Sequence, residues 1–124
     1  MDRTIAIVED DADIRGLLDL ELRAAGYELA FARDAVSALG VIRKAEPDLI
    51  VLDIGLPGGD GFVVLDRLAG FDALETIPVV ALTADVTAET RERAQAAGVK
   101  EFVEKPFEPS TLLEAIESVL GRGS

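Results

Sequence analysis

The chain has 124 residues, enough for one domain over 1–121 with a flexible tail at 122–124, and its 24 acidic and 12 basic side chains give a net charge of −12. This charge argues against direct binding to nucleic acid or to an anionic membrane, and no apolar run approaches the roughly 18 residues of a membrane span. The sequence contains no histidine, which excludes a serine triad and a histidine-ligated zinc, and without cysteine or a signal peptide the expected location is cytoplasmic.

Apolar and amphipathic segments alternate five times along the chain, which predicts a doubly wound (βα)5 fold of the α/β class, with helices on both faces of a five-stranded parallel sheet. Short, mostly apolar runs predict strands at 4–8, 27–31, 48–53, 77–83 and 100–104. Amphipathic runs predict helices at 12–25, 34–45, 60–70, 87–97 and 109–121. The strand at 27–31 alternates polar and apolar residues, so we expect it at an edge of the sheet.

The predicted helices differ in how well one face is apolar. The helix at 12–25 has an apolar stripe, and Arg15 lies outside it; the stripe consists of Ile14, Leu17, Leu18 and Leu22. The helix at 87–97 is the weakest amphipath because many of its residues are alanines and polar residues. We expect this loosely anchored helix to be a moving part.

Polar residues stand at the carboxyl ends of four of the predicted strands. They are Glu9 and Asp10 after the first strand, Asp53 at the end of the third, Thr83 at the end of the fourth and Lys105 after the fifth. Open α/β sheets place their chemistry at this edge. Carboxylates that converge there repel one another, so a divalent cation is the natural counterweight. The pattern predicts a divalent-cation site built around one carboxylate nucleophile.

Magnesium is the cation that these residues fit, with Mn²⁺ as an alternative. Mg²⁺ prefers hard oxygen ligands and usually takes one or two carboxylates plus waters and phosphate oxygens. We expect Asp10 and Asp53 to bind it directly and Glu9 to act through a water. The main-chain carbonyl of Gly55 is a candidate for a further ligand.

Asp53 is the predicted nucleophile. A carboxylate can attack a phosphoryl group and hold it as an acyl phosphate, and this transfer mainly demands positioning and charge neutralisation. Lys105 would add positive charge and Thr83 a hydroxyl hydrogen bond. The glycine-rich stretch 55–61 would shape the loop beside the acceptor, and it lacks the lysine of a nucleotide-binding phosphate loop.

These motifs together resemble the receiver domain of bacterial response regulators, and the resemblance covers essentially the whole chain. It is carried by Ile7-Val8-Glu9-Asp10-Asp11, Asp53, Leu56-Pro57-Gly58-Gly59-Asp60-Gly61, Leu82-Thr83-Ala84 and Glu104-Lys105-Pro106-Phe107. Each motif alone is weak evidence. Their occurrence in this order, at the correct strand ends, is highly specific.

The resemblance implies a flavodoxin-like sheet with strand order 2-1-3-4-5. It also implies Mg²⁺-dependent transfer of a phosphoryl group to Asp53 from a histidine kinase or a histidine phosphotransfer protein. It matches Glu9 and Asp10 to the acidic metal-binding pair, Thr83 to the switch hydroxyl, Lys105 to the phosphoryl-binding lysine, Phe102 to the aromatic switch and Pro106 to a cis peptide bond.

By the same resemblance, phosphorylation should pull Thr83 inward and let Phe102 fill the vacated space. This would bias the face formed by 87–97, 100–104 and 109–121 for signalling to an unknown downstream protein. The expected chemistry is self-phosphorylation and autodephosphorylation, without turnover of an external substrate. Two alternatives stay open, a phosphate sink or relay intermediate and a phosphorylation-independent adaptor. A stand-alone receiver or an excised domain, as a monomer or a phosphorylation-dependent dimer, also fits the sequence.

Overall fold

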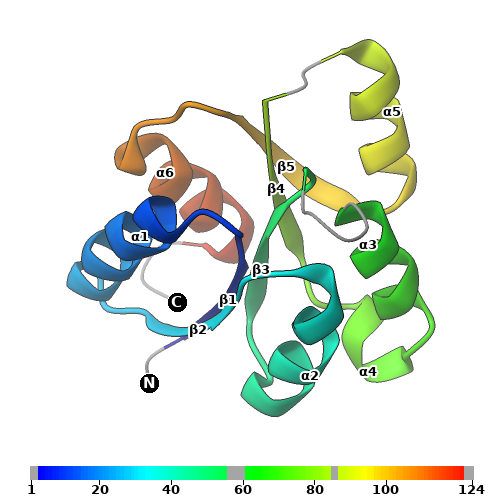
Figure 1. The fold of residues 1–124 in the computed structure, drawn as a ribbon, viewed down its shortest axis with the longest axis horizontal. Helices are drawn as coiled ribbons and strands as arrows, with labels where there is room; N and C mark the ends of the chain where they lie inside the picture. The colour runs from blue at the N-terminus through cyan, green and yellow to red at the C-terminus, as the bar shows by residue number, and fades with distance from the viewer. Residues whose placement is uncertain (1–2, 56–60, 85–86, 122–124) are drawn as a thin grey trace.

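The computed structural model describes residues 3–55, 61–84 and 87–121, which form a five-stranded sheet between two layers of helices (Figure 1). The strands are β1 (Thr4–Val8), β2 (Glu28–Ala32), β3 (Leu49–Asp53), β4 (Val79–Thr83) and β5 (Val99–Glu104). The helices are α1 (Ala12–Ala24), α2 (Ala35–Ala45), α3 (Gly61–Ala69), α4 (Asp72–Glu75), α5 (Ala88–Ala96) and α6 (Pro109–Leu120). The strands pair in parallel in the order β2-β1-β3-β4-β5, which confirms the predicted fold class and puts β2 at an edge.

Each face of the sheet has its own hydrophobic core. α1 and α6 cover one face, and α2, α3, α4 and α5 cover the other (Figure 1). Side chains of β1 alternate between the two cores, with Ile5 and Ile7 on the α1–α6 side and Ala6 and Val8 on the opposite side. Because both faces are buried, the strands read as nearly continuous apolar runs in the sequence.

The short helix α4 is an element that the sequence did not reveal, since the prediction leaves residues 71–76 as a connection. Leu74 is buried in the core beneath it, but one buried residue in four gives no periodic pattern. Because of this segment, β4 begins at Val79 rather than at the predicted residue 77. The Ile77 amide donates to the Leu74 carbonyl at 3.1 Å, and Pro78 has no N–H to donate to a neighbouring strand.

α5 is the helix that the sequence marks as the weakest amphipath, and it buries only Ala94. Two arginines extend from it over aromatic rings. The Arg93 guanidinium lies 3.9 Å from the ring centroid of Phe62 on α3, and that of Arg91 lies 5.4 Å from the ring centroid of Phe102 on β5. Stacking on rings at either side therefore replaces the broad apolar face that anchors the other long helices.

The helices are short, and the longest, α1, has 13 residues. Across the part of the chain that the structure describes, no helix combines the length and the apolar character needed to cross a membrane. The beginning of β1 and the end of α6 are tied together, since the Arg3 guanidinium donates to the Leu120 main-chain oxygen at 2.7 Å. This contact lies at the end of the sheet opposite to the carboxyl ends of the strands.

Candidate functional site

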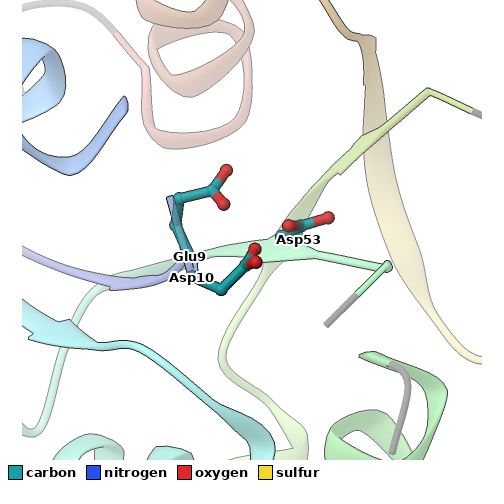
Figure 2. A group of neighbouring side chains, drawn as sticks. All are labelled: Glu9, Asp10 and Asp53. Atoms are coloured by element: carbon teal, nitrogen blue, oxygen red, sulfur yellow. The ribbon is translucent and has the colours of Figure 1, made fainter. Parts of the chain in front are cut away.

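Three acidic side chains converge at the carboxyl ends of two neighbouring strands. Glu9 and Asp10 follow β1, and Asp53 ends β3, which pairs with β1 in parallel. One carboxylate oxygen from each residue lies within 4.8 Å of the other two. Figure 2 shows the three side chains directed toward a common space from their two strands. Pairing of β1 with β3 thus brings together the acids that the sequence singles out.

Lys105 joins two of these acids. Glu9 is fully buried and Asp53 is 4% exposed, whereas Asp10 is exposed. Buried carboxylates are costly unless they are paired. Lys105 Nζ lies 2.6 Å from Glu9 Oε1 and 3.1 Å from Asp53 Oδ2, so it supplies the pairing charge for both.

A main-chain hydrogen bond at the end of the sheet fixes the position of Lys105. Its amide donates to the Thr83 carbonyl at 2.8 Å, which continues the pairing of β4 with β5 beyond Thr83 and Glu104. The following peptide bond, to Pro106, is cis. Thr83 itself is buried at the end of β4, the neighbour of β3. Thr83 and Lys105 therefore stand at the same edge of the sheet as the acids.

The electrostatics of the cluster follow from burial and contact. Burial raises the pKa of Glu9 to about 7, although Lys105 and the Asp11 amide, which donates to Oε2 at 3.1 Å, both act to lower it. Burial also acts to raise the pKa of Asp10, but hydrogen bonding with Asp53 and Glu9 outweighs it and lowers that pKa. Burial acts to lower the pKa of Lys105, yet its contacts with Glu9 and Asp53 raise it overall. Lys105 thus stays charged while Glu9 holds a proton up to near-neutral pH.

The donor atoms fit a divalent cation such as Mg²⁺, which prefers hard carboxylate and carbonyl oxygens. Glu9 Oε1 is buried and makes no aligned hydrogen bond, although it lies in ion contact with Lys105. A lone pair there remains available to a cation or to its bound water. Asp53 Oδ1 accepts from the Gly55 amide at 2.9 Å, which holds Gly55 close to the acid cluster.

Phe102 is another residue that the sequence singled out, and it packs on one face of the sheet. Phe102 is half-buried on β5, where its ring packs against the core on the α2–α5 side. The loop 56–60 and the tail 122–124 lie outside the described residues. What the sequence predicts for those two segments stays a prediction.

Arg15 is a residue of the site that the sequence prediction missed, because that prediction only placed it outside the apolar stripe of its helix. Its side chain is half-buried, and Nη1 donates to the main-chain oxygens of Glu9 and Asp10, both at 2.9 Å. One sequence signal pointed to such a role. A basic residue near the start of a helix is unfavourable for the helix dipole, which suggests that it serves some other contact.

Comparisons with known proteins show the family and the fold of this chain. A family model described as the response regulator receiver domain matches residues 5–117. The phosphate regulon transcriptional regulatory protein PhoB of Escherichia coli is 38% identical over 122 residues, which are 98% of this chain and 53% of PhoB. The chain thus spans about half the length of such curated relatives.

Solved structures show the same fold. The chemotaxis protein CheY4 of Vibrio cholerae superposes with a TM-score of 0.91 at 29% identity, over 96% of this chain and 99% of CheY4. The receiver domain of the sensor histidine kinase PA1611 from Pseudomonas aeruginosa has a TM-score of 0.87 at 26% identity, over 98% of this chain and 99% of its own. That receiver holds a magnesium ion coordinated in its active-site cleft.

The fold and the acidic edge of the sheet thus define a receiver domain of the type found in two-component signalling. Because the family model covers nearly the full sheet, the chain belongs to the response regulator receiver family.

Proposed function

We propose that this chain accepts a phosphoryl group on Asp53 in a two-component phosphorelay, and that the modification switches a surface that binds another protein. The observation that carries the proposal is the bridge from Lys105 to both Glu9 and Asp53 in a buried acid cluster. A lysine in that place can neutralise phosphoryl oxygens on Asp53. Membership of the receiver family supports a histidine kinase or a histidine phosphotransfer protein as the donor.

In the proposed transfer one bond forms and one breaks. An oxygen of the Asp53 carboxylate attacks phosphorus, and the bond from phosphorus to the donor histidine nitrogen breaks with its electron pair staying on that nitrogen. Asp53 then carries an acyl phosphate. Lys105 would donate to one phosphoryl oxygen and the Thr83 hydroxyl to another, while the Gly55 amide keeps the acceptor carboxylate oriented.

Glu9, Asp10, Asp53 and the Gly55 carbonyl would hold Mg²⁺, or Mn²⁺ in its place. When bound, the cation would supply charge neutralisation at the phosphoryl oxygens. Two observations support this assignment. Glu9 Oε1 is buried without an aligned hydrogen bond, and the three carboxylates converge.

The acceptor is tested with acetyl phosphate as a small donor. Wild-type protein is incubated with acetyl phosphate and Mg²⁺ beside Asp53→Ala, and the intact proteins are weighed by mass spectrometry. We expect one phosphoryl adduct on the wild type alone, and none when Mg²⁺ is chelated first. An unmodified wild type would overturn the proposal and favour the phosphorylation-independent adaptor. A long-lived adduct would favour the switch, and rapid decay without a phosphorylation-dependent partner would favour the phosphate sink.

The donor protein is proposed to dock beside the acid cluster. Ile14, Leu17, Ala84, Lys105, Pro106 and Phe107 line a hollow of about 300 Å³ next to the cluster. Leu17 is 39% exposed there, and Leu20, one turn further along α1, is 68% exposed. Exposed apolar residues in and beside this hollow suit contact with the apolar face of a helical donor. Lys105 also lines the hollow, so a donor bound there would have its histidine within reach of Asp53.

The docking surface is tested by Leu17→Glu, which places a charge in the hollow. We expect transfer from a histidine-phosphorylated donor protein to slow by at least about tenfold, since covering a carboxylate with the apolar face of a donor costs more than 1.4 kcal/mol. Phosphorylation by acetyl phosphate should be unaffected because that donor needs no protein contact. Val36→Glu is the matched control, because Val36 is 78% exposed on α2. Equal slowing by the two variants, or slowing with acetyl phosphate, would contradict docking at this hollow.

The output surface is proposed to be the face formed by α5, β5 and α6. Support comes from the weak anchoring of α5, which buries only Ala94, and from the half-buried Phe102 ring beneath Arg91. Movement of Thr83 toward a phosphoryl group on Asp53 would free space for that ring, and α5 could then shift with it.

A further inference from the structure

The loop between β1 and α1 carries three acidic residues in succession, Glu9, Asp10 and Asp11. Two of them must direct their carboxylates at Asp53, although like charges at such distances repel. The β1 side of the loop is anchored by the Glu9 amide, which donates to the Ala32 carbonyl at 2.9 Å. That bond uses the Glu9 amide, so the main-chain oxygens of Glu9 and Asp10 need a separate partner to fix their direction.

Arg15 is that partner. Its Nη1 donates to the Glu9 oxygen and to the Asp10 oxygen, each at 2.9 Å. These bonds use main-chain acceptors, so the carboxylates of both residues remain available to a cation and to Lys105.

The other end of Arg15 is equally fixed. Its amide donates to the Asp11 carbonyl at 3.0 Å in the first turn of α1. Asp11 caps this helix, since its Oδ1 accepts from the amides of Asp13 at 2.8 Å and Ile14 at 3.1 Å. The helix start, the arginine and the acidic loop therefore form one closed arrangement in which moving any member moves the others.

We propose that Arg15 is a positioning residue for the cation site, because its guanidinium fixes the main chain of Glu9 and Asp10 so that their carboxylates converge with Asp53 before the cation binds. This inference rests on the proposed function, which requires a divalent cation at these acids. Residues that orient metal ligands in this way typically change metal affinity by 10–100-fold when mutated.

Charge and geometry make opposite predictions for the loss of Arg15. If Arg15 acted only as a nearby positive charge, its removal would relieve repulsion of Mg²⁺ and tighten binding. If it acts by holding the loop, its removal lets the carboxylates separate and weakens binding. The sign of the change therefore distinguishes the two roles.

The experiment measures Mg²⁺ binding by calorimetry for the wild type, Arg15→Met and a control. Methionine keeps an unbranched apolar stem and removes the guanidinium. Arg23→Met is the matched control because Arg23 lies on the same helix, where it pairs with Asp19 at 2.6 Å on the surface. We expect Arg15→Met to weaken Mg²⁺ affinity by at least about tenfold, and Arg23→Met to leave it unchanged or slightly tighter. The Mg²⁺ concentration that half-saturates phosphorylation by acetyl phosphate should shift by the same factor.

Arg15→Lys covers the case in which Arg15→Met does not fold, as judged by thermal unfolding in a chelator. Lysine keeps the charge, but its ammonium is a compact group with three rotatable N–H donors, has a shorter reach and lacks the planar fork of the guanidinium. Weaker Mg²⁺ binding in this variant therefore again indicates positioning. Affinity equal to or tighter than the wild type in the folded variant would overturn the inference while leaving the proposed function intact. A wild type that binds no Mg²⁺ would instead overturn the proposed function itself.

Discussion

Glu9 is a buried acid whose protonation links the site to pH. Its pKa rises from an ordinary value of 4.5 to about 7 because burial disfavours the carboxylate. Folded protein therefore binds this proton more tightly than unfolded protein does. At pH values between 4.5 and about 7, folding takes up a proton. The contribution of Glu9 to the free energy of unfolding therefore falls as the pH rises through this range. Deprotonated Glu9 is the form that the proposed cation needs, so cation binding would use the form of Glu9 that stabilises the fold less.

We expect Mg²⁺ affinity to fall as the pH drops through about 7, because the proton and the cation compete for Glu9. Calorimetric titrations on either side of that pH test this expectation. Glu9→Gln serves as the control, since it should bind Mg²⁺ more weakly and without pH dependence in this window. A wild-type affinity that is flat across the window would contradict the assignment of Glu9.

At the scale of elements, Gly61 sets how closely α3 approaches β3. A Cβ at this position would lie 2.8 Å from both the Asp53 carbonyl oxygen and the Ile54 Cα. We expect Gly61→Ala to lower the free energy of unfolding by about 1–3 kcal/mol, as overpacking does. Gly55→Ala is the control, because its Cβ would meet Asp53 Oδ1 at an ordinary 3.6 Å. Urea denaturation compares them, and equal stabilities would show that α3 can move away at little cost.

α5 should be the first long helix to open. We expect its amides to exchange with solvent faster than those of α2, which buries Ala35, Ala38 and Ile42. Arg93→Met removes the stack on Phe62 and should speed exchange in α5 by about two- to fivefold, the equivalent of ~0.5–1 kcal/mol for such a contact. Arg67→Met, at the other end of α3, is the control. Hydrogen-exchange mass spectrometry measures the exchange rates of α5 in both variants. Unchanged exchange in Arg93→Met would mean that the stack does not hold the helix.

The sequence predicts those elements whose signals are periodic and those site residues whose position follows from strand ends. Asp53 and Lys105 could be placed together because parallel strands all end at one edge. Arg15 could not, since its role depends on a side chain that turns back across a helix start to main-chain oxygens. The helix α4 was missed because a single buried leucine has no period. The weakness of α5 was read correctly, but its arginine–aromatic contacts depend on helix placement that no local pattern encodes.

At the scale of the whole molecule, the charge of −12 spreads repulsion over a small surface. Sodium chloride should raise the unfolding temperature in the presence of a chelator, because the screening length falls from about 30 Å at about 0.01 M salt to about 8 Å at about 0.15 M. Surface ion pairs such as Arg23–Asp19 lose strength at the same time, but each is worth little. Differential scanning fluorimetry measures the shift. An unfolding temperature that stays constant or falls would show that acidic repulsion is already relieved within the fold.

The bridge from Lys105 to Glu9 and Asp53 spans nearly the entire chain, with its three members at positions 9, 53 and 105. A ribosome releases these residues in that order, and the lysine emerges last. A nascent chain that has already exposed Asp53, the proposed acceptor, still lacks β5 and the Lys105 side chain that follows it. Competence for modification should therefore arise late and abruptly during synthesis, so that a signalling partner meets either a finished domain or an inert one.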